Sequence, residues 1–64
     1  MKKVSENANG NAYHDASTGV SVFEDVQGVV PRYYAWRGTW DDHDGAKHTA
    51  VYDSMGEAVK EVGP

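Results

Sequence analysis

The segment from Arg32 to Ser54 constrains the fold more than any other part of the chain. It reads RYYAWRGTWDDHDGAKHTAVYDS, with an aromatic-rich stretch on each side of an acidic turn that contains Asp44-Gly45. An Asp-Gly pair between alternating stretches is among the strongest local signals for a β-hairpin. We therefore expect strands over residues 33–40 and 47–52, joined by a turn over residues 41–45.

A helix start follows this hairpin directly. Ser54 and Glu57 form a capping box, in which the serine hydroxyl and the glutamate carboxylate satisfy free backbone amides of the first helical turn. Beyond it, four apolar residues recur at i, i+3, i+4 and i+7 and form one stripe: Met55, Ala58, Val59 and Val62. Gly63-Pro64 is typical of a helix end. The pattern predicts a short C-terminal helix that packs on the sheet.

Two further strands are expected before the hairpin. Alternation and β-branched residues indicate a short strand over Ala12–Asp15 and a clearer one over Val20–Glu24, joined by a turn that ends at Gly19. Pro31 fits the start of the aromatic strand, because proline is tolerated where a strand begins. The loop before it carries a short apolar patch, Val29-Val30.

Residues 1–11 show no hydrophobic periodicity, so we expect a flexible or irregular N-terminal arm there. The rest of the pattern predicts the fold class. It is a single small α+β domain over residues 1–64, with an antiparallel sheet of three to four strands and one short C-terminal helix packed on one face.

The size of the chain bounds its chemistry. A domain of 64 residues has a small core and little room for a buried cleft. The absence of cysteine rules out disulfides and thiolate zinc sites. Ser, His and Asp occur in no arrangement that sets a nucleophile against a base, and adjacent carboxylates such as Glu24 and Asp25 point in different directions. We therefore expect no catalytic residue, no enzymatic activity and no cofactor.

A metal site deserves separate consideration, because the acidic turn and its surroundings offer oxygen and imidazole ligands: Asp41, Asp42, His43, Asp44 and His48. An EF-hand alignment that sets Gly45 at the invariant glycine puts Trp40 first and Val51 last, where acidic ligands are needed. A zinc or nickel site with both imidazoles stays open as an alternative. The expectation is a solvated acidic turn without metal.

The charge balance favours a protein partner over nucleic acid. The formal net charge is -4. Two of the six basic residues, Lys2 and Lys3, lie in the expected arm, so the chain from Val4 onward has ten acidic and four basic residues, a balance of -6. Nucleic-acid affinity comes largely from Lys and Arg that displace counterions. An acidic surface of this kind suits a basic protein partner.

The aromatic residues allow two interpretations, because one short helix covers only one face of a sheet. In the first, the core beneath the helix is formed by Phe23, Tyr34, Trp36 and Trp40, and Tyr33 is an ordinary surface residue. In the second, exposed Tyr33 and Trp36 act with Arg32 and Arg37 as an interface anchor, since Tyr, Trp and Arg are enriched in hot spots.

The carboxylates lead to a sharper hypothesis. Gathered on one side, they would imitate the phosphate spacing of a nucleic-acid duplex and occupy the basic cleft of a protein that binds it. They are Glu24, Asp25, Asp41, Asp42, Asp44, Asp53, Glu57 and Glu61. The alternative is that these charges only keep a small protein soluble.

One motif resembles a known family. The order of strands then helix, with Tyr52-Asp53-Ser54-Met55-Gly56-Glu57-Ala58, resembles the aromatic-Asp-Ser/Thr-x-x-Glu-Ala segment of AP2-like and phage integrase arm-binding domains. The resemblance covers roughly residues 19–62. It implies a three-stranded sheet that lies in a DNA groove with the helix behind it. The exposed cations for such a role would be Arg32, Arg37 and Lys47.

In size, acidity and lack of catalytic residues the chain also resembles small inhibitors encoded by phages and mobile elements, including anti-CRISPR proteins. The resemblance implies a non-enzymatic inhibitor in the cytoplasm of a bacterial host. It would bind a basic subunit of a nucleic-acid-handling complex, with CRISPR effectors among the candidates. The expected contact residues are Glu24, Asp25, Asp41, Asp42 and Asp44 for the field and Tyr33, Trp36 and Arg37 for the anchor. The alternatives are an AP2-like DNA-binding module and a small dimerising structural domain.

The membrane is not expected to be a partner. No apolar run approaches the roughly 20 residues that span a bilayer. Met1-Lys2-Lys3 is followed by polar residues rather than by the apolar core of a signal peptide.

Overall fold

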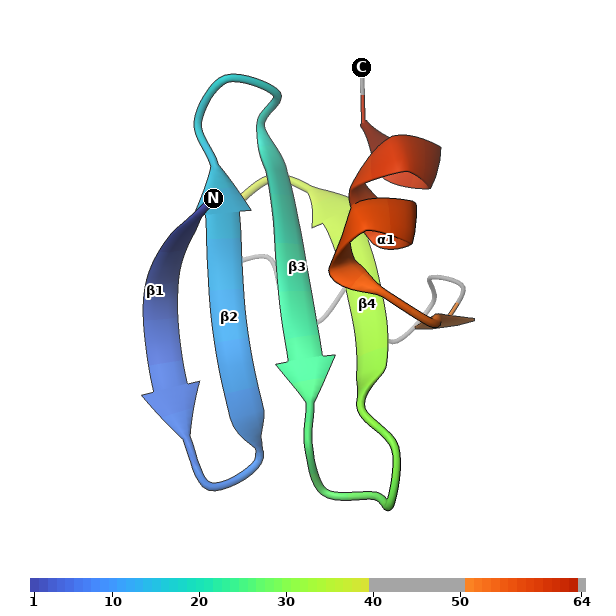
Figure 1. Cartoon of the computed structure of the whole chain (residues 1–64). Helices are drawn as coiled ribbons and strands as arrows, with labels where there is room; N and C mark the ends of the chain where they lie inside the picture. The colour runs from blue at the N-terminus through green and yellow to red at the C-terminus, as the bar shows by residue number, and fades with distance from the viewer. Residues whose placement is uncertain (40–50, 64) are drawn as a thin grey trace.

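The computed structural model of the chain describes residues 1–39 and 51–63. In these ranges it forms a five-stranded antiparallel sheet of order β1-β2-β3-β4-β5 and one helix, α1 (Figure 1). The elements are β1 (Lys2–Asn7), β2 (Gly10–Asp15), β3 (Val20–Asp25), β4 (Arg32–Arg37), β5 (Val51–Tyr52) and α1 (Met55–Val62). The α+β class, the antiparallel sheet and the short C-terminal helix are confirmed, and the sheet has one strand more than the upper limit predicted.

The additional strand is β1, so the expectation of an irregular arm over residues 1–11 is wrong. β1 pairs antiparallel with β2, and its register shifts between Lys3 and Ser5, which marks a β-bulge. The Asn7 side-chain oxygen then accepts hydrogen bonds from the backbone amides of Asn9 (2.8 Å) and Gly10 (3.2 Å) and closes the β1–β2 turn. Because β1 is an exposed edge strand held by backbone pairing, it needs no apolar alternation, and periodicity could not reveal it.

The hairpin prediction is tested only in part. β4 ends at Arg37, three residues before the predicted end of the aromatic strand, and β5 confirms the last two residues of the returning strand. The acidic turn over residues 41–45 and the rest of the returning strand lie outside the described residues.

The helix begins and ends where the sequence predicts. The Ser54 hydroxyl accepts from the Glu57 amide at 3.1 Å, the first half of the capping box. At the other end the Gly63 amide donates to the Val59 carbonyl at 2.6 Å. In the described ranges no helix is long and apolar enough to cross a membrane.

The core lies between α1 and the face of the sheet that carries Val20, Val22 and Ala35. These residues are fully buried together with Ala58 of the helix, and Tyr33 and Tyr52 pack at the margin. Two small alanines, one on each side of the contact, let the helix approach β3 and β4 closely.

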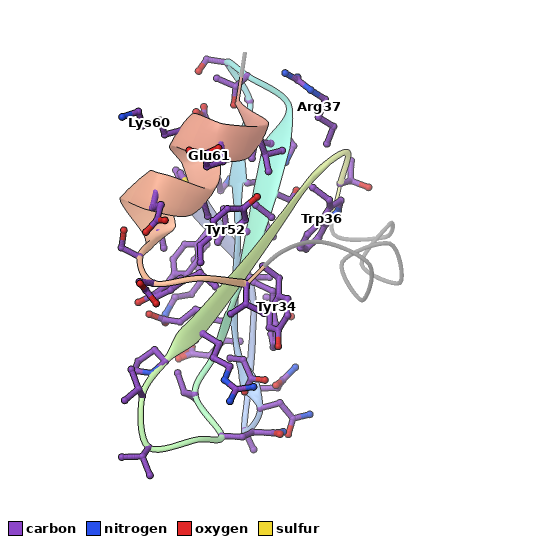
Figure 2. All side chains as sticks on the ribbon, turned by 90° about the vertical axis from the view of Figure 1, so that its right-hand side faces the viewer. Tyr34, Trp36, Arg37, Tyr52, Lys60 and Glu61 are labelled. Carbon is purple, nitrogen blue, oxygen red and sulfur yellow. The ribbon has the colours of Figure 1, made fainter. Side chains whose placement is uncertain are left out.

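The first of the two interpretations, in which Phe23, Tyr34 and Trp36 form the core beneath the helix, is therefore wrong. Side chains alternate between the two faces of a strand, so Tyr34 and Trp36 lie on the face opposite Ala35. Figure 2 shows Tyr52 on the helix side of the sheet, and Tyr34 and Trp36 on the other side. Trp40, the fourth member of the predicted core, lies outside the described residues.

Candidate protein-binding surface

Two of the predicted contact residues, Glu24 and Tyr33, are bonded to each other. The Tyr33 hydroxyl donates to Glu24 Oε2 at 2.8 Å, and Asn11 Nδ2 donates to Glu24 Oε1 at 3.0 Å. The antiparallel register sets the three residues opposite one another on β2, β3 and β4. The hydrogen bond to the Glu24 carboxylate, with some burial, raises the pKa of Tyr33. Tyr33 thus supports the sheet and is not a free anchor.

We expect Tyr33→Phe to lower the free energy of unfolding by about 1 kcal/mol at neutral pH, because Glu24 loses a hydrogen-bond donor. The raised pKa of Tyr33 in the folded state means that its stabilisation is complete below the unfolded-state pKa of 10.0 and is lost as pH rises through the folded-state value. Urea unfolding at pH 7 and at pH 11 measures both effects.

Tyr34→Phe is the matched control, because Tyr34 lies on the opposite face and the described part of the chain gives its hydroxyl no hydrogen bond. This control should change the stability by less than about 0.5 kcal/mol. Equal losses for the two variants would contradict a stabilising role of the bond between Tyr33 and Glu24.

Trp36, the second predicted anchor, is 6% exposed. Its indole Nε1 donates to the Thr39 carbonyl at 2.9 Å, which fixes the ring at the end of β4. Ala12 and Ser21 are buried as well, and strand pairing places them on the same face as Trp36. Both faces of the sheet therefore contain buried side chains, and the indole offers no exposed ring to a partner.

The described arginines are not gathered on one sheet face. Arg37 is exposed at the end of β4, where its Nη1 donates to the Thr18 carbonyl at 3.3 Å. Arg32 begins the same strand, five residues away, so the two lie about 17 Å apart along it and alternate in facing. Lys47 lies outside the described residues. The described residues therefore do not form the cationic sheet face that the AP2-like alternative requires.

The predicted acidic residues are divided. Glu24 and Asp25 lie at the end of β3 and face opposite sides of the sheet, and the Asp25 carboxylate accepts from the Gln27 amide at 3.0 Å. A second group is exposed at the helix: Asp53, Glu57 and Glu61, the last labelled in Figure 2. The predicted residues Asp41, Asp42 and Asp44 lie outside the described residues, so the single acidic patch stays a prediction.

The sheet brings together a serine and a histidine that sequence spacing did not connect. His14 Nδ1 lies 2.8 Å from Ser21 Oγ, because the two residues face each other across β2 and β3. However, the Ser21 hydroxyl donates to the Gly38 carbonyl at 2.6 Å, and Ser21 is 1% exposed. Because this hydroxyl is buried and already donates a hydrogen bond to a carbonyl, it is not placed to react with a substrate. The pair of His14 and Ser21 is instead a structural link between β2 and β3.

Metal binding gains no support from the described ranges, in which no three His, Asp or Glu side chains are grouped to hold an ion. The ligands considered from the sequence, His43 and His48 with the acidic turn, lie outside those ranges.

Among the described residues, the two most exposed large apolar side chains, Val29 and Val30, lie in the loop between β3 and β4, and Val26 of the same loop is exposed as well. Val29 is fully exposed, Val30 is 69% exposed and Val26 is 43% exposed. We call these three residues the valine tip. The sequence carried part of this signal, because Val29-Val30 lies between Gly28 and Pro31, where a strand is disfavoured, but periodicity alone did not separate a surface loop from a buried one.

The loop is fastened to the neighbouring turn at its base. The Val26 amide donates to the Asn9 carbonyl at 3.1 Å, and Gln27 Nε2 donates to Asn9 Oδ1. Figure 1 shows the β1–β2 and β3–β4 connections at the same end of the sheet. Val29 and Val30 of the valine tip therefore project from a braced support, to which Val26 belongs, rather than from a free loop.

Comparison with known proteins gave no match, either to a protein-family model, to a curated protein or to a solved structure. Function must therefore be inferred from the surface chemistry of the chain itself, and within residues 1–39 and 51–63 the valine tip and the carboxylates at the end of β3 are the main features.

Proposed function

We propose that the chain is a non-enzymatic inhibitor that binds a basic protein of a nucleic-acid-handling complex, with CRISPR effectors among the candidates. The observation that carries the proposal is the valine tip. The described part of the chain buries few apolar side chains and yet exposes three valines in one loop, and exposed apolar patches mark interaction sites. The net charge of -4 would steer the domain toward a basic surface.

The proposed contact surface differs from the one expected from the sequence. Tyr33 and Trp36 support the sheet, and the exposed valines take the place of the aromatic anchor. Glu24 and Asp25 keep their proposed place beside the contact, because they end β3 next to the loop. Asp41, Asp42 and Asp44 keep their proposed role, which is to supply negative charge that imitates nucleic-acid phosphates.

The test is a binding and inhibition assay against a panel of purified bacterial nucleic-acid-binding complexes that includes CRISPR effectors. We expect binding to at least one member, loss of its DNA binding or cleavage, and weaker association at high salt. The variant Asp41→Lys/Asp42→Lys/Asp44→Lys should fold and bind more weakly. A DNA duplex with no panel member is the control, and direct binding to it with a steep salt dependence would instead favour the AP2-like alternative.

A further inference from the structure

We infer that the valine tip inserts into a concave apolar pocket of the protein partner, and that the pocket carries basic residues at its rim. The inference rests on the proposed function and deepens it by naming the contact surface and the chemistry that receives it. Four features of the loop carry it: exposure, bracing, area and charge.

The exposure of the tip favours a concave receptor. Val29 is fully exposed and Val30 is 69% exposed, which means that the two side chains project outward rather than lie along the sheet. A flat partner would cover one side of such a projection, whereas a pocket removes water from all sides of it. Apolar burial drives association in proportion to the area removed from water.

Bracing makes the tip suitable for insertion. Three hydrogen bonds hold the loop. The Val26 backbone amide and the Gln27 side-chain amide donate to Asn9, and the Gln27 backbone amide donates to the Asp25 carboxylate. Bonds at the base of a loop reduce the conformational entropy that is lost on binding. Pro31 fixes one more backbone angle at the end of the loop.

The area of the tip argues against a second copy of the chain as its occupant. A stable protein interface buries about 1,200–2,000 Å² in total. Two tips that meet end to end bring together only six valine side chains, far below that area. A partner pocket lets the surrounding loop and strand ends add to the contact.

The charged residues beside the valine tip indicate which charges the rim of the partner's pocket should carry. Glu24 and Asp25 end β3 at the loop, and Arg32 begins β4 opposite Asp25. Glu24 accepts its hydrogen bonds from Asn11 and Tyr33, whose donor groups are uncharged and so do not offset a carboxylate. Lys3 Nζ lies 3.6 Å from Glu6 Oε1 on β1, so these two charges offset each other. Of the other three, Glu24 and Asp25 are acidic and Arg32 is basic, which leaves one net negative charge at this end of the sheet. A basic rim on the partner complements it.

The experiment compares Val29→Asp/Val30→Asp with Val4→Asp/Val51→Asp, which alters two other exposed valines by the same substitution. Both variants are first checked for wild-type circular dichroism and urea unfolding, and both add the same charge. Against the panel member that binds the wild-type chain, the loop variant should bind at least 30-fold more weakly and the control within about 3-fold. Equal affinities of the two variants would overturn the inference and leave the proposed function intact.

A second arm decides the inference if no panel member binds, an outcome that counts against the proposed function. A photo-crosslinking residue is placed at position 29 or at position 4, and the chain is irradiated in a bacterial extract. We expect a dominant adduct from position 29 alone, with the attachment point in the partner mapped by mass spectrometry to an apolar pocket that has Lys or Arg at its edge. Adducts from neither position, from both equally, or on a flat surface would overturn the inference.

Discussion

Gly10→Ala is expected to prevent stable folding. Gly10 has a φ of 158°, and a Cβ placed there would collide with the backbone carbonyl oxygen of Glu24 and lie 3.0 Å from the Phe23 ring. Neither strand can move away, because β2 is paired on both sides. The expected cost is about 3 kcal/mol or more, which is comparable to the whole stability of a domain of this size. Circular dichroism and urea unfolding measure it.

Two other glycines show whether the effect is specific. A Cβ at Gly28 would have the Val30 carbonyl oxygen at 3.7 Å as its nearest neighbour, an ordinary contact, so Gly28→Ala should change stability by less than about 0.5 kcal/mol. At Gly56, inside the helix, nothing lies within 4 Å, and Gly56→Ala should stabilise the chain by about 0.5–1 kcal/mol. A Gly10→Ala protein as stable as Gly28→Ala would show that β2 and β3 do not approach as described.

Val22→Ala should produce the second largest loss. Val22 is fully buried on β3, opposite Ala35 and beneath the helix. The substitution removes two methyl groups and leaves a cavity that a small sheet cannot close, so we expect the free energy of unfolding to fall by about 2 kcal/mol. Urea unfolding followed by tryptophan fluorescence gives the value.

Val29→Ala is the matched control, because it is the same substitution at a fully exposed side chain. Its effect on stability should stay below about 0.5 kcal/mol. If Val29→Ala were as costly as Val22→Ala, the valine tip would be part of the core, and both the exposure of the loop and the inference built on it would be contradicted.

Local signals decided the parts of the fold that the sequence predicted correctly. The helix start at Ser54, its end at Gly63 and the strands near Val20 and Arg32 follow from capping and strand patterns that act within a few residues. These interactions form between near neighbours in the chain, so the sequence is enough to recognise them.

The contact residues could not be predicted in the same way. The sequence identified Tyr33 and Trp36 as bulky and Glu24 as charged, but Tyr33 and Glu24 satisfy each other, and Trp36 is buried away from the helix. Residue type gives the capacity for an interaction, and cross-strand neighbours decide whether that capacity is already used.

The size, the acidity, the α+β class and the short C-terminal helix could be predicted without any structure, because they follow from composition and from local periodicity. Tertiary structure alone decided that residues 2–7 form an edge strand, that the helix covers the face of Val22 and Ala35, and that the valine tip is exposed. The reason is physical. Strand pairing and the choice of a sheet face depend on contacts between residues distant in the chain, which no local pattern encodes.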